Sequence, residues 1–165
     1  MKSGISFSFD KKRKRSKMVS VFGEESSEEE FDEEELKKRA VDSAKQGKFK
    51  ESLTLFDRLI RRGSKDATVY EMRSQIFMEM DDRFEAIRSA HRATELNSDW
   101  YIAWLTLARA QLNFGEAELA LKSAEMAMKK SSEEDESVLS FLREVRVIVQ
   151  RLREKGKDGC RLKVI

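Results

Sequence analysis

Residues that could carry out chemistry are scarce in this sequence. Its 165 residues contain one histidine, His91, and one cysteine, Cys160, which lie far apart in the chain. They offer no neighbouring pair that could act as a nucleophile and its base. The sequence also has no Gly-rich phosphate-binding loop, no His-Glu-x-x-His zinc motif and no paired cysteines. We therefore predict that the chain is not an enzyme, and we expect neither a metal site nor a cofactor.

A basic block near the start of the chain is the first charged feature. Charged residues make up 39% of the chain, yet its formal net charge is only +2, because the two signs are segregated along it. The basic residues of the block are Lys11, Lys12, Arg13, Lys14, Arg15 and Lys17. Such a block is typical of a nuclear-import signal or of a contact with nucleic acid, and it could also be a solvated tail. The import alternative predicts an import receptor as a partner and a nuclear or nucleo-cytoplasmic location.

An acidic block follows at residues 24–35, where nine of the twelve residues are Asp or Glu. Ser26 and Ser27 each have a glutamate three residues later, which is the spacing of acid-directed kinase targets, so both are candidate phosphorylation sites. Each phosphate would add a charge of about −1.5 to −2. Residues 1–32 are predicted to form a disordered tail, and residues 1–10 show no helical period. In that tail the acidic block could cover the basic one, or it could simply lead into the first helix, whose dipole favours acidic residues.

A repeat of 34 residues organises the chain from 33 to 134. Gly115 aligns with Asp81 and with Gly47, and all three are residues that favour turns. Other slots of the repeat hold Leu36, Tyr70 and Trp104; Ser52, Ala86 and Ala120; Phe56, Ala90 and Ala124; and Leu59, Ala93 and Ala127. Small residues in such slots allow two helices to approach closely, and a larger side chain there would overpack the contact. The repeat predicts three helix–turn–helix units, at 33–66, 67–100 and 101–134.

This pattern resembles the tetratricopeptide-repeat family, whose unit has 34 residues. The third unit matches best, through Trp104, Leu107, Ala108, Gly115, Ala120 and Ala127. The first unit departs most, with Ser52 in place of alanine, and serine replaces the family's proline at the end of each unit. Segments 66–75 and 107–112 are most similar to the osmosis-responsive-factor type of small tetratricopeptide-repeat protein. The resemblance implies an all-α solenoid and an adaptor without catalytic activity.

A further helix is predicted at 135–155, after the third unit. Its apolar residues form a single stripe, and its other faces are polar. The last unit of a solenoid leaves an apolar face open, and an amphipathic helix with a polar outer face can close it. We therefore predict a capping helix. Residues 156–165 contain two glycines and several charges, and are predicted to be a flexible tail.

The family resemblance also implies where a partner would bind. Family members bind an extended peptide on the concave face, which the first helix of each hairpin lines. The matching positions are Lys37, Thr68, Glu71, Gln75, Met78, Glu79, Leu105, Arg109, Leu112 and Asn113, with Val41, Ala44 and Ile102 beside them. Members that clamp the C-terminal carboxylate of a chaperone use lysines, asparagines and an arginine there. Here Lys37 matches, but Val41, Met72, Ile102 and Thr106 occupy the other clamp positions.

Two functions therefore remain open. The favoured one is a protein-interaction adaptor whose concave face binds an amphipathic helix or a partly apolar peptide of a partner protein, and not a chaperone tail. The alternative is a nuclear factor whose basic block contacts the phosphates of nucleic acid, although no aromatic residue is interleaved with the basic ones for stacking on bases. The salt dependence of the binding affinity would distinguish these two functions, because phosphate contacts weaken steeply as the ionic strength rises. No run of about 18 apolar residues is present, so we expect no membrane partner.

Overall fold

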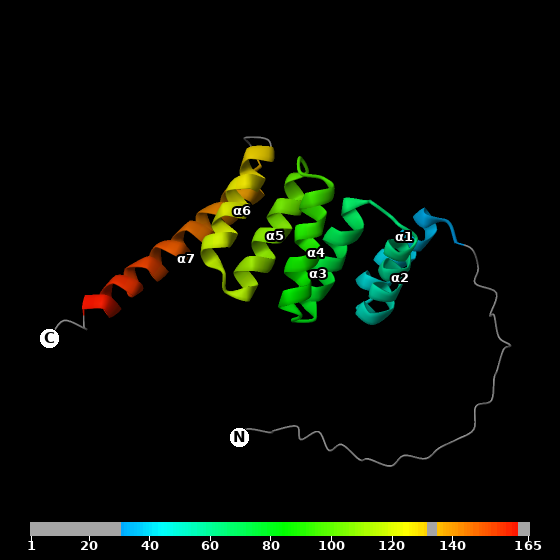
Figure 1. Ribbon diagram of the computed structural model, residues 1–165, viewed down its shortest axis with the longest axis horizontal. Helices are drawn as coiled ribbons and strands as arrows, with labels where there is room; N and C mark the ends of the chain where they lie inside the picture. The colour runs from blue at the N-terminus through cyan, green and yellow to red at the C-terminus, as the bar shows by residue number, and fades with distance from the viewer. Residues whose placement is uncertain (1–30, 132–134, 162–165) are drawn as a thin grey trace, which may run out of the picture. The chain divides into compact units, whose positions relative to one another are not determined.

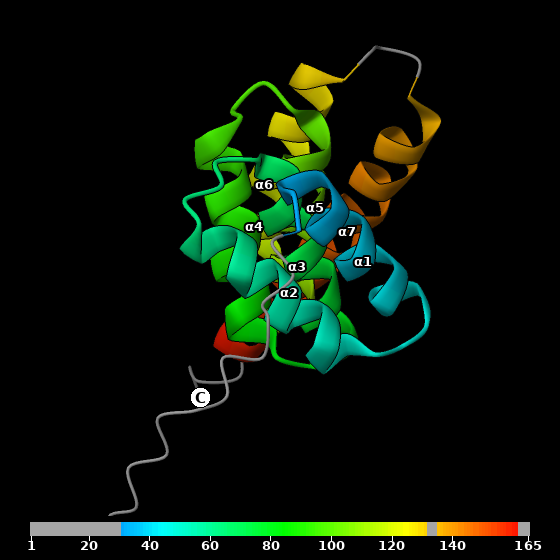
Figure 2. The ribbon, with the colours of Figure 1, turned by 90° about the vertical axis from the view of Figure 1, so that its right-hand side faces the viewer.

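The computed structural model describes residues 31–131 and 135–161, with side chains up to residue 155. Within these residues the chain forms seven α-helices and no strand. The helices are α1 (Glu33–Lys45), α2 (Phe49–Arg61), α3 (Ala67–Glu79), α4 (Arg83–Leu96), α5 (Tyr101–Phe114), α6 (Ala117–Lys130) and α7 (Glu136–Arg161). The first six form three antiparallel hairpins that stand in a row, and α7 follows the third hairpin (Figure 1). Figure 2 looks along this row from the α1–α2 end.

The predicted all-α class, with three hairpins and a capping helix, is confirmed. Each helix pair falls within one of the predicted 34-residue units. The basic block, Ser26, Ser27 and the predicted disordered tail up to residue 30 lie outside the described residues. The last two residues of that predicted tail belong to the fold instead. Arg62 donates a hydrogen bond of 2.6 Å to the carbonyl of Phe31, and the Arg39 guanidinium lies 3.6 Å from the centre of the Phe31 ring.

The turns inside the hairpins repeat the same backbone conformation. Gly47, Asp81 and Gly115, which are 34 residues apart, have φ angles of 74°, 58° and 101°. This left-handed region costs glycine little, and aspartate tolerates it better than most other residues. Each of the three residues ends the first helix of its hairpin and turns the chain toward the second. The alignment of turn residues in the sequence therefore reports a real structural period.

Small residues also occupy matching places in the three hairpins. In the first hairpin the Ser52 hydroxyl donates a hydrogen bond of 2.6 Å to the carbonyl of Ala40. In the second hairpin the roles are exchanged, and the Ser74 hydroxyl donates at 2.8 Å to the carbonyl of Ala86. Both serines are buried, so these bonds satisfy hydroxyl groups that would otherwise be costly. The close contact between α1 and α2 therefore accommodates Ser52 in the slot that holds alanine in the other two hairpins.

Ala120 occupies the same slot in the third hairpin and has no exposed surface. We expect Ala120→Leu to destabilise the protein by about 1–3 kcal/mol, because the added atoms would overpack the contact between α6 and α7. Thermal unfolding followed by circular dichroism would measure the effect. Lys122→Leu is the matched control, since Lys122 is exposed on the same helix. A melting temperature that is unchanged in Ala120→Leu would contradict the packing described here.

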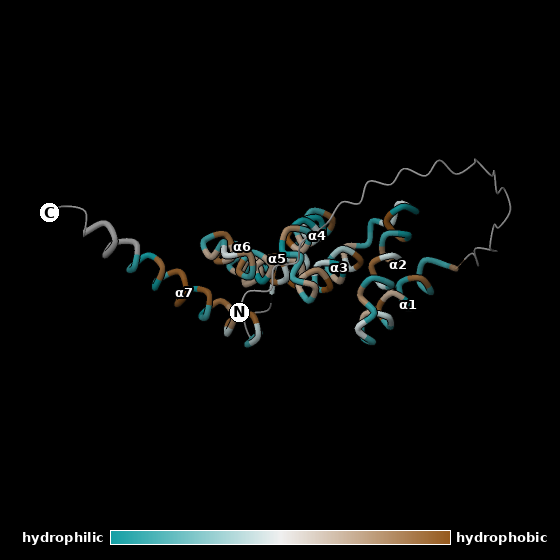
Figure 3. The backbone as a smooth tube through the Cα atoms, turned by 90° about the horizontal axis from the view of Figure 1, so that it is seen from below, coloured by the Kyte–Doolittle hydropathy of each residue, from teal (hydrophilic) through white to brown (hydrophobic). Residues whose placement is uncertain are grey.

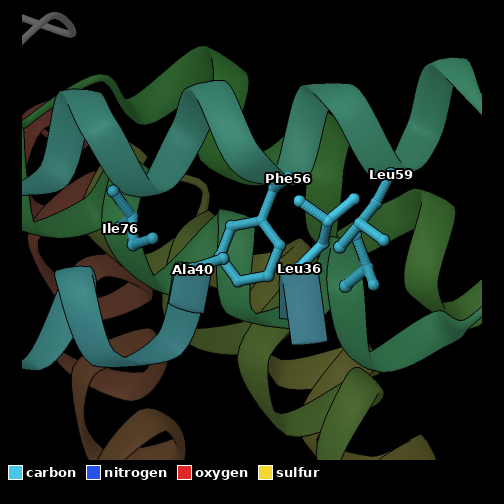
Figure 4. Close-up of a cluster of buried hydrophobic side chains, with 6 residues drawn as sticks. Leu36, Ala40, Phe56, Leu59 and Ile76 are labelled. Carbon is cyan, nitrogen blue, oxygen red and sulfur yellow. The ribbon is translucent and has the colours of Figure 1, made fainter. Parts of the chain in front are cut away.

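The contact between the first two hairpins differs from the others. In the second and third hairpins the slots that face the next unit hold alanines, but in the first they hold Phe56 and Leu59, both fully buried. These side chains pack with Leu36, Ala40 and Ile76 (Figure 4). The backbones of α2 and α3 consequently approach each other at far fewer points than those of α4 and α5. We call this contact the Phe56 seam. Hollows open on both sides of it, one toward α1 and one toward α4.

The capping helix α7 buries one stripe of its surface. Val138, Leu142, Val145 and Val149 are buried against α5 and α6, and the other faces are mainly exposed. Figure 3 shows the resulting alternation of hydrophilic and hydrophobic residues along α7. Asp135 caps the helix by accepting hydrogen bonds from Ser137 and from the backbone of Val138. These hydrogen bonds, first of all that from the Ser137 hydroxyl, hold the pKa of Asp135 below its ordinary value.

The helix α7 is longer than the sequence predicts. Residues 156–165 were expected to form a flexible tail, but the helix continues through the two glycines to Arg161. A glycine costs a helix about 1 kcal/mol relative to alanine, yet it can adopt the helical conformation. The lysines beside the glycines, Lys155 and Lys157, are good helix formers. Residues 162–165 lie outside the described part of the chain.

Candidate functional site

The hollow on the α1 side of the Phe56 seam is the candidate site. It has a volume of about 310 Å³ and lies between α1 and α3, with α2 behind them. Its apolar lining consists of Val41, Ala44, Phe49, Phe56, Met72 and Ile76. Lys45, Gln75 and Glu79 complete the lining with polar groups. An apolar hollow with a few polar groups is the usual form of a site that binds another molecule. We call it the α1–α3 groove.

Helical periodicity explains why these side chains converge. Met72, Gln75, Ile76 and Glu79 are spaced by three or four residues on α3, so they share one face of that helix. Val41 and Ala44 present the matching face of α1 in the same way. Phe56 of α2 lies behind the groove, where it packs with Ala40 of α1 and Ile76 of α3.

Four of the residues predicted to lie on the concave face line this groove. Gln75 and Glu79 belong to the predicted peptide-binding set, and Val41 and Ala44 were expected beside it. Met72, expected at a clamp position, also lines it. Lys45, Phe49, Phe56 and Ile76 complete the lining, and the sequence analysis did not assign them to peptide binding. The signal for them was the large pair Phe56 and Leu59 in slots that hold alanine in the other two units.

Glu71 is a correction to the predicted set. It was expected among the peptide-binding residues of the concave face, but it is only 4% exposed. Its carboxylate accepts a hydrogen bond of 2.7 Å from the Thr106 hydroxyl and a second one from the Gln75 side chain. Because a buried carboxylate needs such partners, Glu71 links α3 to α5. It is therefore not available to a peptide.

The third part of the predicted face is covered by α7 at Leu105 and partly at Leu112, while Arg109 stays exposed. Leu105 is 5% exposed and packs with Ala127 and Val138, so its predicted contact with a peptide is also corrected. Leu112 packs beside Val145, and the Arg109 guanidinium lies 5.5 Å from the centre of the Phe141 ring. The sequence predicted the capping helix but not that it would cover these positions.

The remaining predicted residues lie on the exposed edge or turn toward the hairpin core. Asn113 is exposed at the end of α5. Met78 is half-buried and packs with Phe77, Ala86 and Ala110, so it contributes mainly to the contact between the second and third hairpins. Neither of them lines the α1–α3 groove.

Lys37, the one residue that matches the carboxylate clamp, is already paired. Its amino group lies 2.6 Å from the carboxylate of Asp66. Asp66 also caps α3, because it accepts hydrogen bonds of 2.9 Å and 2.8 Å from the backbone and hydroxyl of Thr68. Burial raises the pKa of Asp66, but the hydrogen bonds from Lys37 and Thr68 outweigh it and hold this pKa below its ordinary value of 3.8. Lys37 and Thr68, both in the predicted peptide-binding set, therefore serve the contact between α1 and α3.

The Lys37–Asp66 pair predicts how stability depends on pH. Because the pKa of Asp66 is lowered on folding, the pair stabilises the folded state fully above about pH 4 and loses this effect as the pH falls through the lower folded pKa. We expect Lys37→Met to flatten the fall of the unfolding free energy over this acidic range, as measured by urea unfolding at several pH values. Lys38→Met is the control, since Lys38 is exposed next to it. Identical pH profiles for the two variants would contradict the role of this pair.

The other clamp positions also lack free donors. Val41, Met72 and Ile102 have apolar side chains, and the Thr106 hydroxyl is buried and bonded to Glu71. A peptide carboxylate placed here would therefore lose water without gaining hydrogen bonds.

Within the described residues, no group of three or more His, Cys, Asp or Glu side chains is placed to hold a metal ion. None of the helices in this part of the chain is long and apolar enough to cross a membrane.

The chain has three hairpins with a 34-residue period, a left-handed turn in each hairpin and small residues in matching slots. These features identify it as a tetratricopeptide-repeat protein. Among named relatives it is similar to tetratricopeptide repeat protein 33 of Mus musculus, with 32% identity over 128 residues, which are 74% of this chain and 49% of that protein. It is 30% identical over 125 residues, 75% of this chain and 33% of the relative, to Hsc70-interacting protein 1 of Drosophila melanogaster. The chain thus spans about half or less of the length of these relatives.

A solved structure shares the fold. The first tetratricopeptide-repeat domain of Spaghetti (RPAP3), bound to the HSP90 peptide SRMEEVD, superposes with a TM-score of 0.67 at 17% identity and covers 72% of this chain and 93% of that one. No protein-family model matches the chain. The narrower resemblance to the osmosis-responsive-factor type stays a prediction.

Proposed function

We propose that the chain is a non-enzymatic adaptor that binds a segment of a partner protein in the α1–α3 groove. The segment that fits this groove carries apolar side chains on one face, as an amphipathic helix or a partly apolar peptide does. Its apolar side chains lie against Val41, Phe49 and Met72. Its polar groups meet Lys45, Gln75 and Glu79.

One observation carries this proposal, namely that the groove is apolar and open although the fold could close it. Where the later hairpins have alanines in the Phe56 and Leu59 slots the helices approach closely, whereas α1 and α3 approach each other less than α3 and α5 do. An apolar surface left accessible in this way gains free energy when a partner covers it.

The relatives support a peptide partner in general terms. One is named for an interaction with Hsc70, and the solved neighbour holds an HSP90 peptide. The clamp positions of this chain nevertheless lack donors for a C-terminal carboxylate, because Lys37 is paired with Asp66 and three other positions are apolar. We therefore propose an internal, partly apolar segment and not a chaperone tail as the ligand.

A charge placed in the groove tests the proposal. We expect Val41→Glu to weaken binding of a peptide selected on the wild-type chain from a random peptide library by at least about tenfold, because the new carboxylate would be desolvated in an apolar groove. Isothermal titration calorimetry would give the dissociation constants. Lys38→Glu is the matched control, since it introduces the same residue at an exposed position of α1 that does not line the groove. Equal affinities for both variants would refute binding in the groove.

The nuclear location and the import receptor rest on the basic block alone, and we keep them as proposals. A fluorescent fusion of the chain should lose nuclear enrichment when residues 11–17 are deleted. Nuclear enrichment that persists without these residues would exclude the block as the import signal.

A further inference from the structure

The hollow on the α4 side of the Phe56 seam is larger than the α1–α3 groove. Its volume is about 620 Å³, and it lies between α2 and α4 above α3. Ile60, Tyr70 and Ile87 supply its apolar surface. We call it the α2–α4 hollow. It shares no lining residue with the α1–α3 groove, so a molecule bound in one leaves the other accessible.

Arg73 forms the back wall of this hollow. Its guanidinium lies 3.0 Å from the Asp57 carboxylate on α2, donates a long hydrogen bond of 3.5 Å to the Ser89 hydroxyl on α4, and lies 5.0 Å from the centre of the Phe77 ring. Its side chain is mostly buried. Arg73 therefore ties α2, α3 and α4 together and holds the hollow in shape, and its positive charge remains close to whatever enters.

The edge of the hollow carries basic groups on α4. Arg88 lies 2.8 Å from Glu85, while Arg92 and His91 share Glu95 at 2.7 Å and 3.2 Å. These ion pairs are largely exposed, and such pairs contribute little to stability. A carboxylate of a partner can therefore replace Glu85 or Glu95 without a large loss to the fold.

Phe84 lies on the same edge and is 65% exposed, which makes it the most exposed large apolar side chain among the described residues. It precedes Arg88 by four residues and Arg92 by eight, so the three side chains follow one face of α4. Covering an exposed aromatic ring with an apolar side chain lowers the free energy, because it removes apolar surface from water. The edge thus combines an aromatic ring with arginines, which is a composition enriched where proteins bind each other.

We propose that the α2–α4 hollow is a second docking site, for an acidic segment of a partner protein that places an apolar side chain between its carboxylates. The apolar side chain lies against Phe84, Ile87 and Ile60. The flanking carboxylates meet Arg88 and Arg92, with Arg73 behind them. Charge complementarity favours an acidic partner, since the lining carries three arginines against two carboxylates, Asp57 and Glu95. The chain then has two separate sites, and it can hold two segments at once.

Nuclear magnetic resonance of the ¹⁵N-labelled full chain tests this proposal with two synthetic probes. One is a short peptide of glutamates around a central phenylalanine, and the other replaces every glutamate by lysine. We expect only the acidic peptide to shift the amide resonances of α2 and α4, and we expect its affinity to fall at high salt. Shifts produced equally by both peptides, shifts confined to other helices, or no binding at millimolar peptide would each overturn the proposal.

Variants complete the test. We expect the double variant Arg88→Glu/Arg92→Glu to lower the affinity for the acidic peptide at least tenfold. We expect the same of the single variant Phe84→Ser. Lys122→Glu with Lys129→Glu makes the same change of charge at exposed positions on α6, and is expected to retain the affinity apart from a small uniform effect. Circular dichroism melting shows whether each variant is folded. A folded Arg88→Glu/Arg92→Glu variant with wild-type affinity would contradict the proposed site in the α2–α4 hollow. It would not bear on the proposed binding in the α1–α3 groove.

Discussion

Phe56→Ala is expected to destabilise the protein by about 3–5 kcal/mol. Phe56 is fully buried, and its ring fills the space between Leu36, Ala40 and Ile76 (Figure 4). Truncation removes most of the side chain, and the surrounding helices can close only part of the cavity. Since domains of this size are stable by only about 5–15 kcal/mol, this is a large fraction of the total. Urea unfolding monitored by circular dichroism would measure the change.

The effect of Phe56→Ala should also be local. Phe56 lies at the centre of the apolar contact between the first hairpin and the second, so the first hairpin is expected to unfold at a lower urea concentration than the rest. Phe114→Ala is the matched control, because Phe114 is largely exposed at the end of α5, and its loss is expected to change stability by less than about 0.5 kcal/mol. Similar losses for both variants would contradict the role given to Phe56.

Val145→Asp is expected to cost about 3–5 kcal/mol, because it places an unpaired carboxylate in an apolar contact. Val145 has no exposed surface and packs with Ala117, Ala120 and Val149 between α6 and α7. The variant should release α7 and expose the apolar face of the third hairpin. We therefore expect it to unfold at lower urea concentration and to self-associate, as sedimentation velocity would show.

Val147→Asp is the control for this prediction. It makes the same substitution two residues later on the same helix, at a position that is 49% exposed. Its effect on stability is expected to be within about 0.5 kcal/mol. If Val147→Asp were as damaging as Val145→Asp, the buried stripe of α7 would be assigned to the wrong face.

The repeat could be read from the sequence because it depends on local chemistry. Gly47, Asp81 and Gly115 mark turns through their backbone conformation, and Ala86 and Ala120 mark close contacts through their size. Both signals recur every 34 residues, so each one supports the others. The end of α7 was misjudged because Gly156 and Gly159 weaken a helix without ending it.

The lining of the α1–α3 groove could be predicted only in part, since it depends on contacts between distant residues. The family pattern placed Gln75 and Glu79 on one face of α3, and both line the α1–α3 groove. The pattern could not show that Thr106 holds Glu71, that Asp66 holds Lys37, or that α7 covers Leu105. These contacts join residues 29 to 35 positions apart or belong to different helices, so no local spacing reports them.

Hydrogen–deuterium exchange of the full chain, with and without a peptide selected on it, is the most direct test of the α1–α3 groove. Bound peptide is expected to slow amide exchange in α1 and α3, where Val41, Met72 and Gln75 line the groove, and to leave α6 and α7 unchanged. The Val41→Glu variant should show no such protection at the same peptide concentration. Protection confined to α5–α7, or equal protection in the wild type and in Val41→Glu, would contradict binding between the first two hairpins.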